Sequence, residues 1–265
     1  LLQQISIMKN PIPKQTIYRK GAAILFWLLV WQIAAIFMKN SIVFVGPVDM
    51  LRSLLDQIQQ SEFWLSLWNS MVKIMGGFLC AFLAGILFAV LAWRLPLIET
   101  LLEPVIQLAK SVPVASLVVL LLIFMGSENL SIVLVFLMAF PMIYVNMGQG
   151  LAHVDTKLLE MAQVFHMSPW KQFLYLYRPA FLPFLISGSK IALGMSWKSG
   201  VAGEIIGVPS HSIGEQLYMA KIYLNTESLF AWTLVIILLS IFFEKLFLFL
   251  LKKAGGKAWK GETNS

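Results

Sequence analysis

Residues 158–179 read LLEMAQVFHMSPWKQFLYLYRP, a polar and amphipathic stretch in a chain that is otherwise mostly apolar. Of the 265 residues, 59% are hydrophobic and only 12% are charged, and the mean hydropathy is +0.81. Soluble domains average about 25% charged residues. The composition therefore indicates an integral membrane protein, and a charged, amphipathic stretch in its middle needs its own explanation.

Long apolar runs predict an all-α membrane protein with about six transmembrane helices, because about 20 apolar residues cross the hydrocarbon of a bilayer. The candidate spans are 21–38, 71–93, 101–124, 131–148, 184–206 and 229–251. The third run contains Lys110 and Pro113, so we expect it to be kinked or to begin near Ser111. The runs are not interrupted by a soluble domain, and we expect residues 1–265 to form a single transmembrane domain.

The net charge of +7 is better explained by membrane topology than by nucleic-acid binding. Basic residues cluster at the two ends of the chain and in the loops between apolar runs, and cytoplasmic flanks of membrane proteins are rich in Lys and Arg. This rule predicts that residues 1–20, 149–180 and 252–265 are cytoplasmic. We expect a multi-pass protein with both termini inside and no nucleic-acid partner.

Two segments near the N-terminus, an apolar run and an amphipathic stretch, each predict a helix. Residues 21–38 follow a basic segment, but the run is long for a signal peptide and no small-x-small cleavage site follows, so we expect an uncleaved first span. The stretch PVDMLRSLLDQI begins at Pro47, a residue favoured at the first position of a helix. Its apolar residues fall on one face, which predicts a short external helix on the membrane surface or on other helices.

The polar stretch itself predicts two short helices joined by a turn. Asp155 can cap the first helix, and Ser168 followed by Pro169 can begin the second. We expect the second helix to end at Arg178 and Pro179. The first helix carries an apolar stripe, formed by Leu151, Val154, Leu158, Met161 and Phe165. This stripe either packs on the protein's own bundle or forms a docking surface for a cytoplasmic partner, because long ordered loops are often functional.

The stretch EMAQVFHMSPWKQFLYLYRPAFLP resembles the EAA loop of permease subunits of binding-protein-dependent ABC importers. Glu160, Met161 and Ala162 stand at E-A-A, His166 at the loop's glycine, and Arg178-Pro179 at its Leu-Pro ending. The stretches ALGMSWKSGVAGEIIG, KSVPVASLVVLLLIFMGS and FVGPVDMLRSLLDQI resemble the nitrate/sulfonate/taurine branch of these permeases. The resemblance extends from about Phe44 to Lys252.

The resemblance implies a MetI-like permease fold in the bacterial cell membrane, with the 149–180 segment as a coupling loop that docks in a groove of a separate ABC ATPase. The residues it implies for this coupling are Glu160, Met161, Ala162, Gln163, His166 and Ser168. Met161, His166 and Arg178 depart from the family pattern, although His tolerates the left-handed backbone region in which the Gly is expected. The implied partners are that ATPase, an extracytoplasmic solute-binding protein and a second permease copy.

Ionisable residues inside the spans give a second set of candidates, because charge is costly in the bilayer. Lys198 lies near the middle of the fifth span, among small residues that let helices approach closely. It either pairs with a buried group in a tightly packed helix or lines the translocation path and attracts an anion. The tentative path residues are Gly194, Ser196, Trp197, Lys198 and Glu204. Glu204 could equally contact the binding protein or pair with a lysine.

The leading interpretation is a transport permease that is not itself an enzyme. The chain lacks a G-x-x-x-x-G-K-[ST] phosphate loop, so we expect ATP hydrolysis in a separate subunit. The three histidines share no metal-ligand spacing and no nucleophile–base set is evident, so we expect no catalytic residue, metal or cofactor. The expected solute is a nitrate-, sulfonate- or taurine-like anion or a vitamin precursor. An ion-coupled secondary transporter or channel is the alternative, although internal repeats and a convincing mid-membrane carboxylate are missing.

Overall fold

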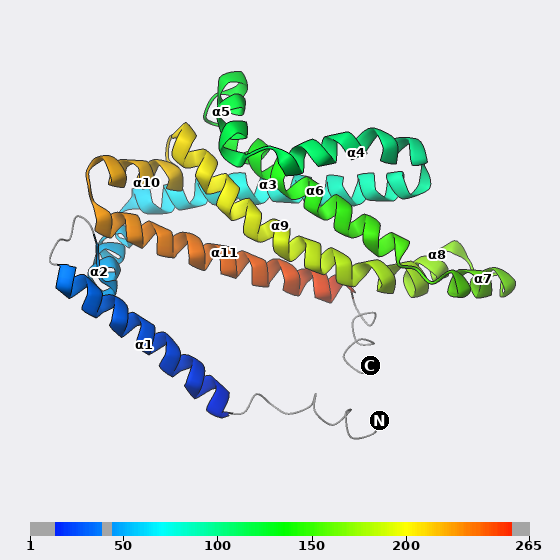
Figure 1. Ribbon diagram of the computed structural model, residues 1–265, viewed down its shortest axis with the longest axis horizontal. Coiled ribbons are helices and arrows are strands. Elements are labelled where there is room, and N and C mark those ends of the chain that lie inside the picture. The colour runs from blue at the N-terminus through cyan, green and yellow to red at the C-terminus, as the bar shows by residue number, and fades with distance from the viewer. Residues whose placement is uncertain (1–13, 39–43, 256–265) are drawn as a thin grey trace. The chain divides into compact units, whose positions relative to one another are not determined.

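The computed structural model describes residues 14–38 and 44–255, and this part of the chain is helical and without strands (Figure 1). The helices are α1 (Lys14–Met38), α2 (Pro47–Ile58), α3 (Ser61–Arg94), α4 (Pro96–Ser111), α5 (Val114–Met125), α6 (Leu130–Ala152), α7 (Thr156–Val164), α8 (Pro169–Gln172), the π-helix η2 (Phe173–Tyr177), α9 (Arg178–Gly207), α10 (Ile213–Ile222) and α11 (Thr226–Gly255). Most of the predicted segment 1–20 and of the predicted tail 252–265 lies outside the described residues. The all-α fold predicted from the sequence is confirmed.

Five stretches of helix among the described residues are long and apolar enough to cross a membrane, and a sixth span results if the bent pair α4–α5 counts as one. The five are Gly21–Met38, Ser61–Arg94, Leu130–Ala152, Pro169–Gly207 and Thr226–Lys253. The helix that contains the predicted second span, α3, begins at Ser61, ten residues before the predicted start of that span. The prediction of about six spans agrees with this architecture.

The predicted third span is broken by a sharp bend. The α4 and α5 axes differ by 108° across a break at Val112 and Pro113. Val112 has an extended backbone (φ −72°, ψ 128°), the conformation that a following proline favours. The expected kink is therefore confirmed, and the proline that causes it begins the next helix as its N-cap.

The described residues divide into two compact units, which are treated separately: 14–38 and 44–59 with 220–231, and 60–219 with 232–255. In the first unit, the Trp31 indole donates to the Val45 carbonyl at 2.9 Å, and Phe230 packs near Trp31 and Phe44. Here α2 begins at Pro47 as predicted, and its apolar face is exposed. The prediction of a single transmembrane domain stays a prediction.

The core of the second unit is formed by α3, α6 and α9, which lie side by side (Figure 1). Small residues bring these helices together. A Cβ added to Gly77 of α3 would lie 2.5 Å from the Ile132 carbonyl oxygen of α6, and one added to Gly150 of α6 would lie 2.6 Å from Phe181 Cα of α9. Close backbone approach of this kind is the usual way in which membrane helices associate. The long helix α9 therefore has a fixed position between the loop that precedes it and the turn that follows it.

Candidate coupling loop and pathway helix

The first helix of the predicted coupling loop, α7, begins as the sequence predicts. The Asp155 carboxylate accepts a hydrogen bond of 2.8 Å from the Lys157 backbone N–H, which is the usual contact of an N-cap side chain. The helix then runs for nine residues to Val164. The prediction of where α7 starts is therefore confirmed. It could be made from the sequence because the capping contact joins residues two positions apart.

The turn after α7 is built around His166, which has a positive φ of 46°. The His166 N–H donates to the Gln163 carbonyl at 3.0 Å, and the Met167 N–H donates to the Ala162 carbonyl at 2.8 Å. These two bonds define a Schellman motif, in which glycine usually occupies the left-handed position. The expectation that histidine can take the place of that glycine is confirmed in the backbone geometry.

The second helix of the loop differs from its prediction. Ser168 stands at the N-cap and Pro169 at the first position, as expected, but the Ser168 side chain makes no capping bond. The helix does not end at Arg178 and Pro179, and instead continues through the π-helix η2 into α9. The ring of a proline such as Pro179 crowds the preceding turn of a regular α-helix. Here the preceding turn is the wider η2, in which the Arg178 N–H donates to the Phe173 carbonyl, and this turn accommodates Pro179.

The predicted apolar stripe of the loop is divided between the core and the surface. Leu151 is buried, whereas Leu158 and Met161 are exposed and Phe165 is 76% exposed. The stripe therefore packs on the protein's own bundle only at its start. Three further side chains of the loop are more than 60% exposed: Val164, Trp170 and Tyr175.

The six predicted coupling residues lie together on α7 and the turn. Ala162 is only 2% exposed and its carbonyl accepts the Met167 N–H of the turn, whereas Glu160, Met161, Gln163, His166 and Ser168 are exposed. The Gln172 side chain donates to the Met167 carbonyl at 2.8 Å and ties α8 to the turn. Gln172 was not among the predicted coupling residues. Its contact is local, with a residue five positions earlier, but it depends on the backbone conformation of the turn, which the residue spacing alone does not indicate.

The five predicted path residues on α9 do not lie on one face. Lys198 is exposed, and a Cβ added to Gly194 would meet nothing within 4 Å, so these two residues share an open face with Ser187 and Ile191. Trp197 is 1% exposed and stacks on Phe243 at 5.7 Å. The Ser196 hydroxyl is buried and donates to the Ala192 carbonyl at 2.7 Å. In this conformation Trp197 and Ser196 therefore belong to the packed side of the helix.

Glu204, the fifth path candidate, is completely buried and forms what we call the Glu204 clamp, with Ser70, Ile213 and Gly214. Its Oε2 accepts from the Ser70 hydroxyl at 2.6 Å and from the Gly214 N–H at 3.3 Å, and the Ile213 N–H donates to Ser70 Oγ at 2.8 Å. The clamp joins α3, α9 and the start of α10. Within residues 14–38 and 44–255, the hydrogen bonds of the Glu204 carboxylate go to Ser70 and Gly214 and not to a lysine. Contact of Glu204 with the binding protein stays a prediction.

Exposed polar contacts surround the loop that leads into α10. Lys73 and Glu128 form an ion pair of 3.1 Å, and the Ser210 N–H donates to the other Glu128 oxygen at 3.2 Å. The hydrogen bond from the Lys73 ammonium and, to a smaller extent, the one from the Ser210 N–H hold the pKa of the Glu128 carboxyl below its usual range. In the described part of the chain, no group of three or more His, Cys, Asp or Glu residues could hold a metal ion.

Comparison with known proteins defines the class of protein to which this helix arrangement and loop belong. Residues 81–254 match the family described as the binding-protein-dependent transport system inner membrane component. This match covers more than half of the chain, and the protein belongs to that family. It is a multi-pass transport permease and not an enzyme.

Individual relatives support the same assignment. The chain is 27% identical to a putative aliphatic sulfonates transport permease, SsuC, from Bacillus subtilis, over 87% of this chain and 84% of that protein. It is 24% identical to the taurine transport system permease TauC from Escherichia coli, over 88% of this chain and 87% of that protein. A chain of the inward-facing MetNI methionine ABC transporter matches with a TM-score of 0.50 at 18% identity, covering 75% of this chain and 93% of that chain.

These findings confirm the predicted family, its nitrate/sulfonate/taurine branch and the MetI-like fold. They favour the importer permease over the secondary transporter or channel. The binding-protein-dependent family implies two kinds of partner, an ATPase and a solute-binding protein.

Proposed function

We propose that this permease imports a small anion with the coupling loop as its contact to a separate ATPase subunit. The exposed apolar surface of the loop carries the proposal. Phe165 and Trp170 are more than 70% exposed, and both flank the ordered turn at His166. Exposed apolar patches of this kind usually mark protein–protein contacts. The six coupling residues from Glu160 to Ser168 would lie at the edge of that contact.

In this proposal ATP-driven closure of the ATPase pushes the coupling loop and swings the spans between inward-open and outward-open states. The η2 segment leads directly from the loop into α9, so a displacement of the loop reaches the open face of α9 that carries Lys198 and Gly194. A second copy of the chain would supply the other half of the path. The positive-inside rule supports a plasma-membrane orientation with the coupling loop and both termini in the cytoplasm.

The relatives support the solute class. Three relatives are named as transport permeases for aliphatic sulfonates, taurine and bicarbonate, and these solutes share a small anionic group. Lys198 is exposed and could attract such an anion into the path. A solute-binding protein would deliver the anion at the outer side. If the cognate solute-binding protein bound only cations or sugars, the anion proposal would be wrong.

Charge reversal at Glu160 tests the coupling proposal. We expect Glu160→Arg to insert normally but to lose the copurifying ATPase and binding-protein-dependent uptake, because the exposed carboxylate would be replaced by a bulky cation at the contact. Glu99→Arg is the matched control, since Glu99 is an exposed carboxylate in the first turn of α4, outside the coupling loop and before the predicted third span. Uptake at the wild-type rate in the Glu160 variant would refute the docking site, and loss of uptake in both variants would show a general effect of charge.

A further inference from the structure

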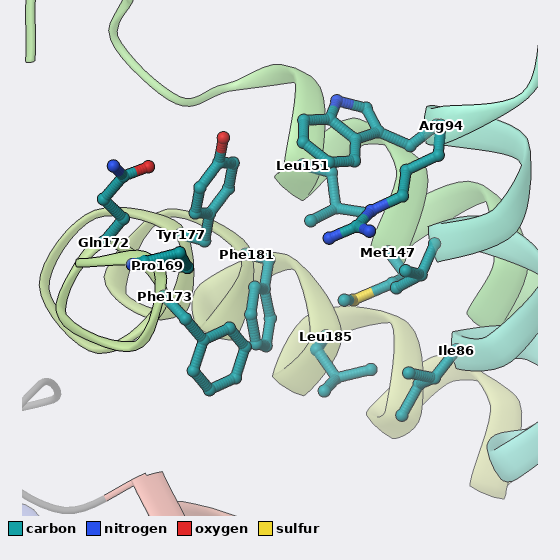
Figure 2. Close-up of a pocket in the computed structure, with 12 residues that line it drawn as sticks. Ile86, Arg94, Met147, Leu151, Pro169, Gln172, Phe173, Tyr177, Phe181 and Leu185 are labelled. Atoms are coloured by element: carbon teal, nitrogen blue, oxygen red, sulfur yellow. The ribbon is translucent and has the colours of Figure 1, made fainter. Parts of the chain in front are cut away.

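A cavity of about 390 Å³ lies where the ends of α3 and α6 meet the coupling loop (Figure 2). Its walls include Val90 and Arg94 of α3, Met147 and Leu151 of α6, and Phe173 and Tyr177 of η2. The volume falls within the range of about 300–1,000 Å³ that is typical of small-molecule sites. Neither the family resemblance nor the coupling proposal assigns this cavity a ligand.

The one charged residue in the cavity wall is Arg94, and it has no recorded partner. Figure 2 shows its guanidinium extending past Leu151 toward Met147 rather than away from the cavity. Within residues 14–38 and 44–255, the Arg94 guanidinium forms no hydrogen bond and no ion pair. A guanidinium presents several fixed N–H donors, and it binds carboxylate and phosphate groups particularly well. A cation above apolar walls therefore fits a ligand with an anionic head and an apolar body.

The surroundings of the cavity match the edge of a bilayer. Helix α3 has 34 residues, about 50 Å of helix, which exceeds the ~30 Å of bilayer hydrocarbon. Arg94 is its last residue, so its side chain can reach the level of the lipid headgroups. Trp93 packs edge-on against Tyr177 at 5.3 Å beside the same cavity. Trp and Tyr are enriched at the membrane–water interface.

We propose that this cavity binds an anionic phospholipid of the inner leaflet, with its phosphate on Arg94 and one acyl chain between Val90, Met147 and Phe173. Basic pockets between transmembrane helices on the cytoplasmic side are a known type of anionic-lipid site. The assignment to the inner leaflet rests on the cytoplasmic position proposed for the coupling loop.

The position of the cavity gives the lipid a role in coupling. One wall belongs to α3 and α6 in the packed core, and the opposite wall belongs to α8 and η2. The η2 turn is a π-helix, a geometry that is often found at functional sites. An acyl chain between these walls fixes the spacing of η2 from α3, so that movement of the coupling loop is passed on to α9 instead of being absorbed by an empty space.

The test uses the assembled importer, with its ATPase and binding protein, in nanodiscs of phosphatidylcholine alone or mixed with phosphatidylglycerol. Arg94→Gln removes the cation, Val90→Trp fills the cavity while leaving Arg94 in place, and Lys253→Gln removes an exposed cation from the end of α11, outside the cavity. Native mass spectrometry counts the phosphatidylglycerol molecules retained, and transport-coupled ATP hydrolysis is measured in both lipid mixtures.

We expect the wild type and Lys253→Gln to retain phosphatidylglycerol and to hydrolyse ATP faster when it is present. Arg94→Gln should bind it roughly tenfold more weakly, as expected for a lost charge-assisted hydrogen bond, and Val90→Trp should exclude it. Both cavity variants should lose the stimulation by lipid. Undiminished retention in Arg94→Gln and Val90→Trp would overturn the proposal. So would binding of a short alkanesulfonate at Arg94 together with unchanged lipid retention, because the cavity would then be a solute site.

Failure of the lipid proposal can be distinguished from failure of the coupling proposal. Glu160→Arg should lose the ATPase but keep its phosphatidylglycerol, since Glu160 does not line the cavity. A wild-type permease that retains the lipid at Arg94 yet recruits no ATPase would refute the coupling proposal alone. An importer that is active and coupled but binds the lipid equally well without Arg94 would refute the lipid site alone.

Discussion

The two ends of α9 differ in their surroundings: polar side chains are buried and hydrogen-bonded at one end, and apolar side chains are exposed at the other. The helix has 30 residues and is about 45 Å long, and it connects the coupling loop to the Glu204 clamp. At the clamp, a buried carboxylate and a buried hydroxyl are hydrogen-bonded to each other and to backbone N–H groups. At the loop, large apolar side chains are exposed, and a cavity lies between η2 and α3 beside the contact of Trp93 with Tyr177.

This difference shows which end is held by hydrogen bonds within one chain. Buried polar groups are expensive unless they are paired, so the clamp can persist only if its helices keep their positions. Exposed apolar surface and a cavity do not fix the positions of helices in this way. They are typical of a surface that contacts a partner and can move. One helix therefore has an end held by buried hydrogen bonds and an end with exposed apolar surface, as the proposed coupling requires.

Gly214 provides the strongest test of the fixed end. A Cβ at this position would overlap Cβ and the carbonyl carbon of Glu204, so Gly214→Ala must push α10 away from α9. We expect it to lower stability by about 3 kcal/mol or more, at the upper end of overpacking effects, and to reduce the yield of folded protein. Thermal unfolding in detergent measures the change.

Gly194→Ala is the matched control for this prediction. A Cβ there would meet nothing within 4 Å, and alanine is the better helix former by up to ~1 kcal/mol. We expect unchanged or slightly higher stability in that variant. Equal stability of the two variants would mean that α10 is not held against α9 as the clamp requires.

Substitution of Glu204 separates the hydrogen bonds of the clamp from its charge. Glu204→Ala leaves the Gly214 N–H and the Ser70 hydroxyl without their acceptor, and we expect a loss of about 2–4 kcal/mol, since each unsatisfied buried group costs about 1–3 kcal/mol. Glu204→Gln keeps an oxygen that can accept both bonds, so it should lose less than half as much. The same unfolding assay compares the two variants, and equal losses would show that the carboxylate charge, and not its hydrogen bonds, holds the clamp.

The contrast between the two ends also explains what could be predicted from the sequence. Asp155, His166 and Pro113 act within a few residues of their own position, through a cap, a left-handed turn and a restricted backbone. Their effects were predicted correctly because cap and turn chemistry is local. The apolar runs predicted the spans for a similar reason, since bilayer thickness fixes their length.

The contacts of α9 could not be predicted in the same way. Ser70 and Glu204 are 134 residues apart, and nothing in either local sequence indicates that they meet. Trp197 and Lys198 are neighbours in the sequence, yet one is buried against Phe243 and the other is exposed. Small residues in this helix correctly suggested close packing, but they did not show which face packs, because that depends on the helices opposite.

His166 provides the finest test of the docking end. A β-branched residue adopts a positive φ with difficulty, so His166→Val should weaken the turn by about 1–2 kcal/mol, whereas His166→Gly should keep it or strengthen it. Hydrogen exchange at the Met167 amide, which donates to Ala162 across the turn, reports this directly. We expect faster exchange and weaker ATPase retention for His166→Val alone, with the clamp unaffected in both variants. If the valine variant keeps its protected amide but still loses the ATPase, the imidazole itself contacts the partner, and His166 is then a docking residue as well as a turn residue.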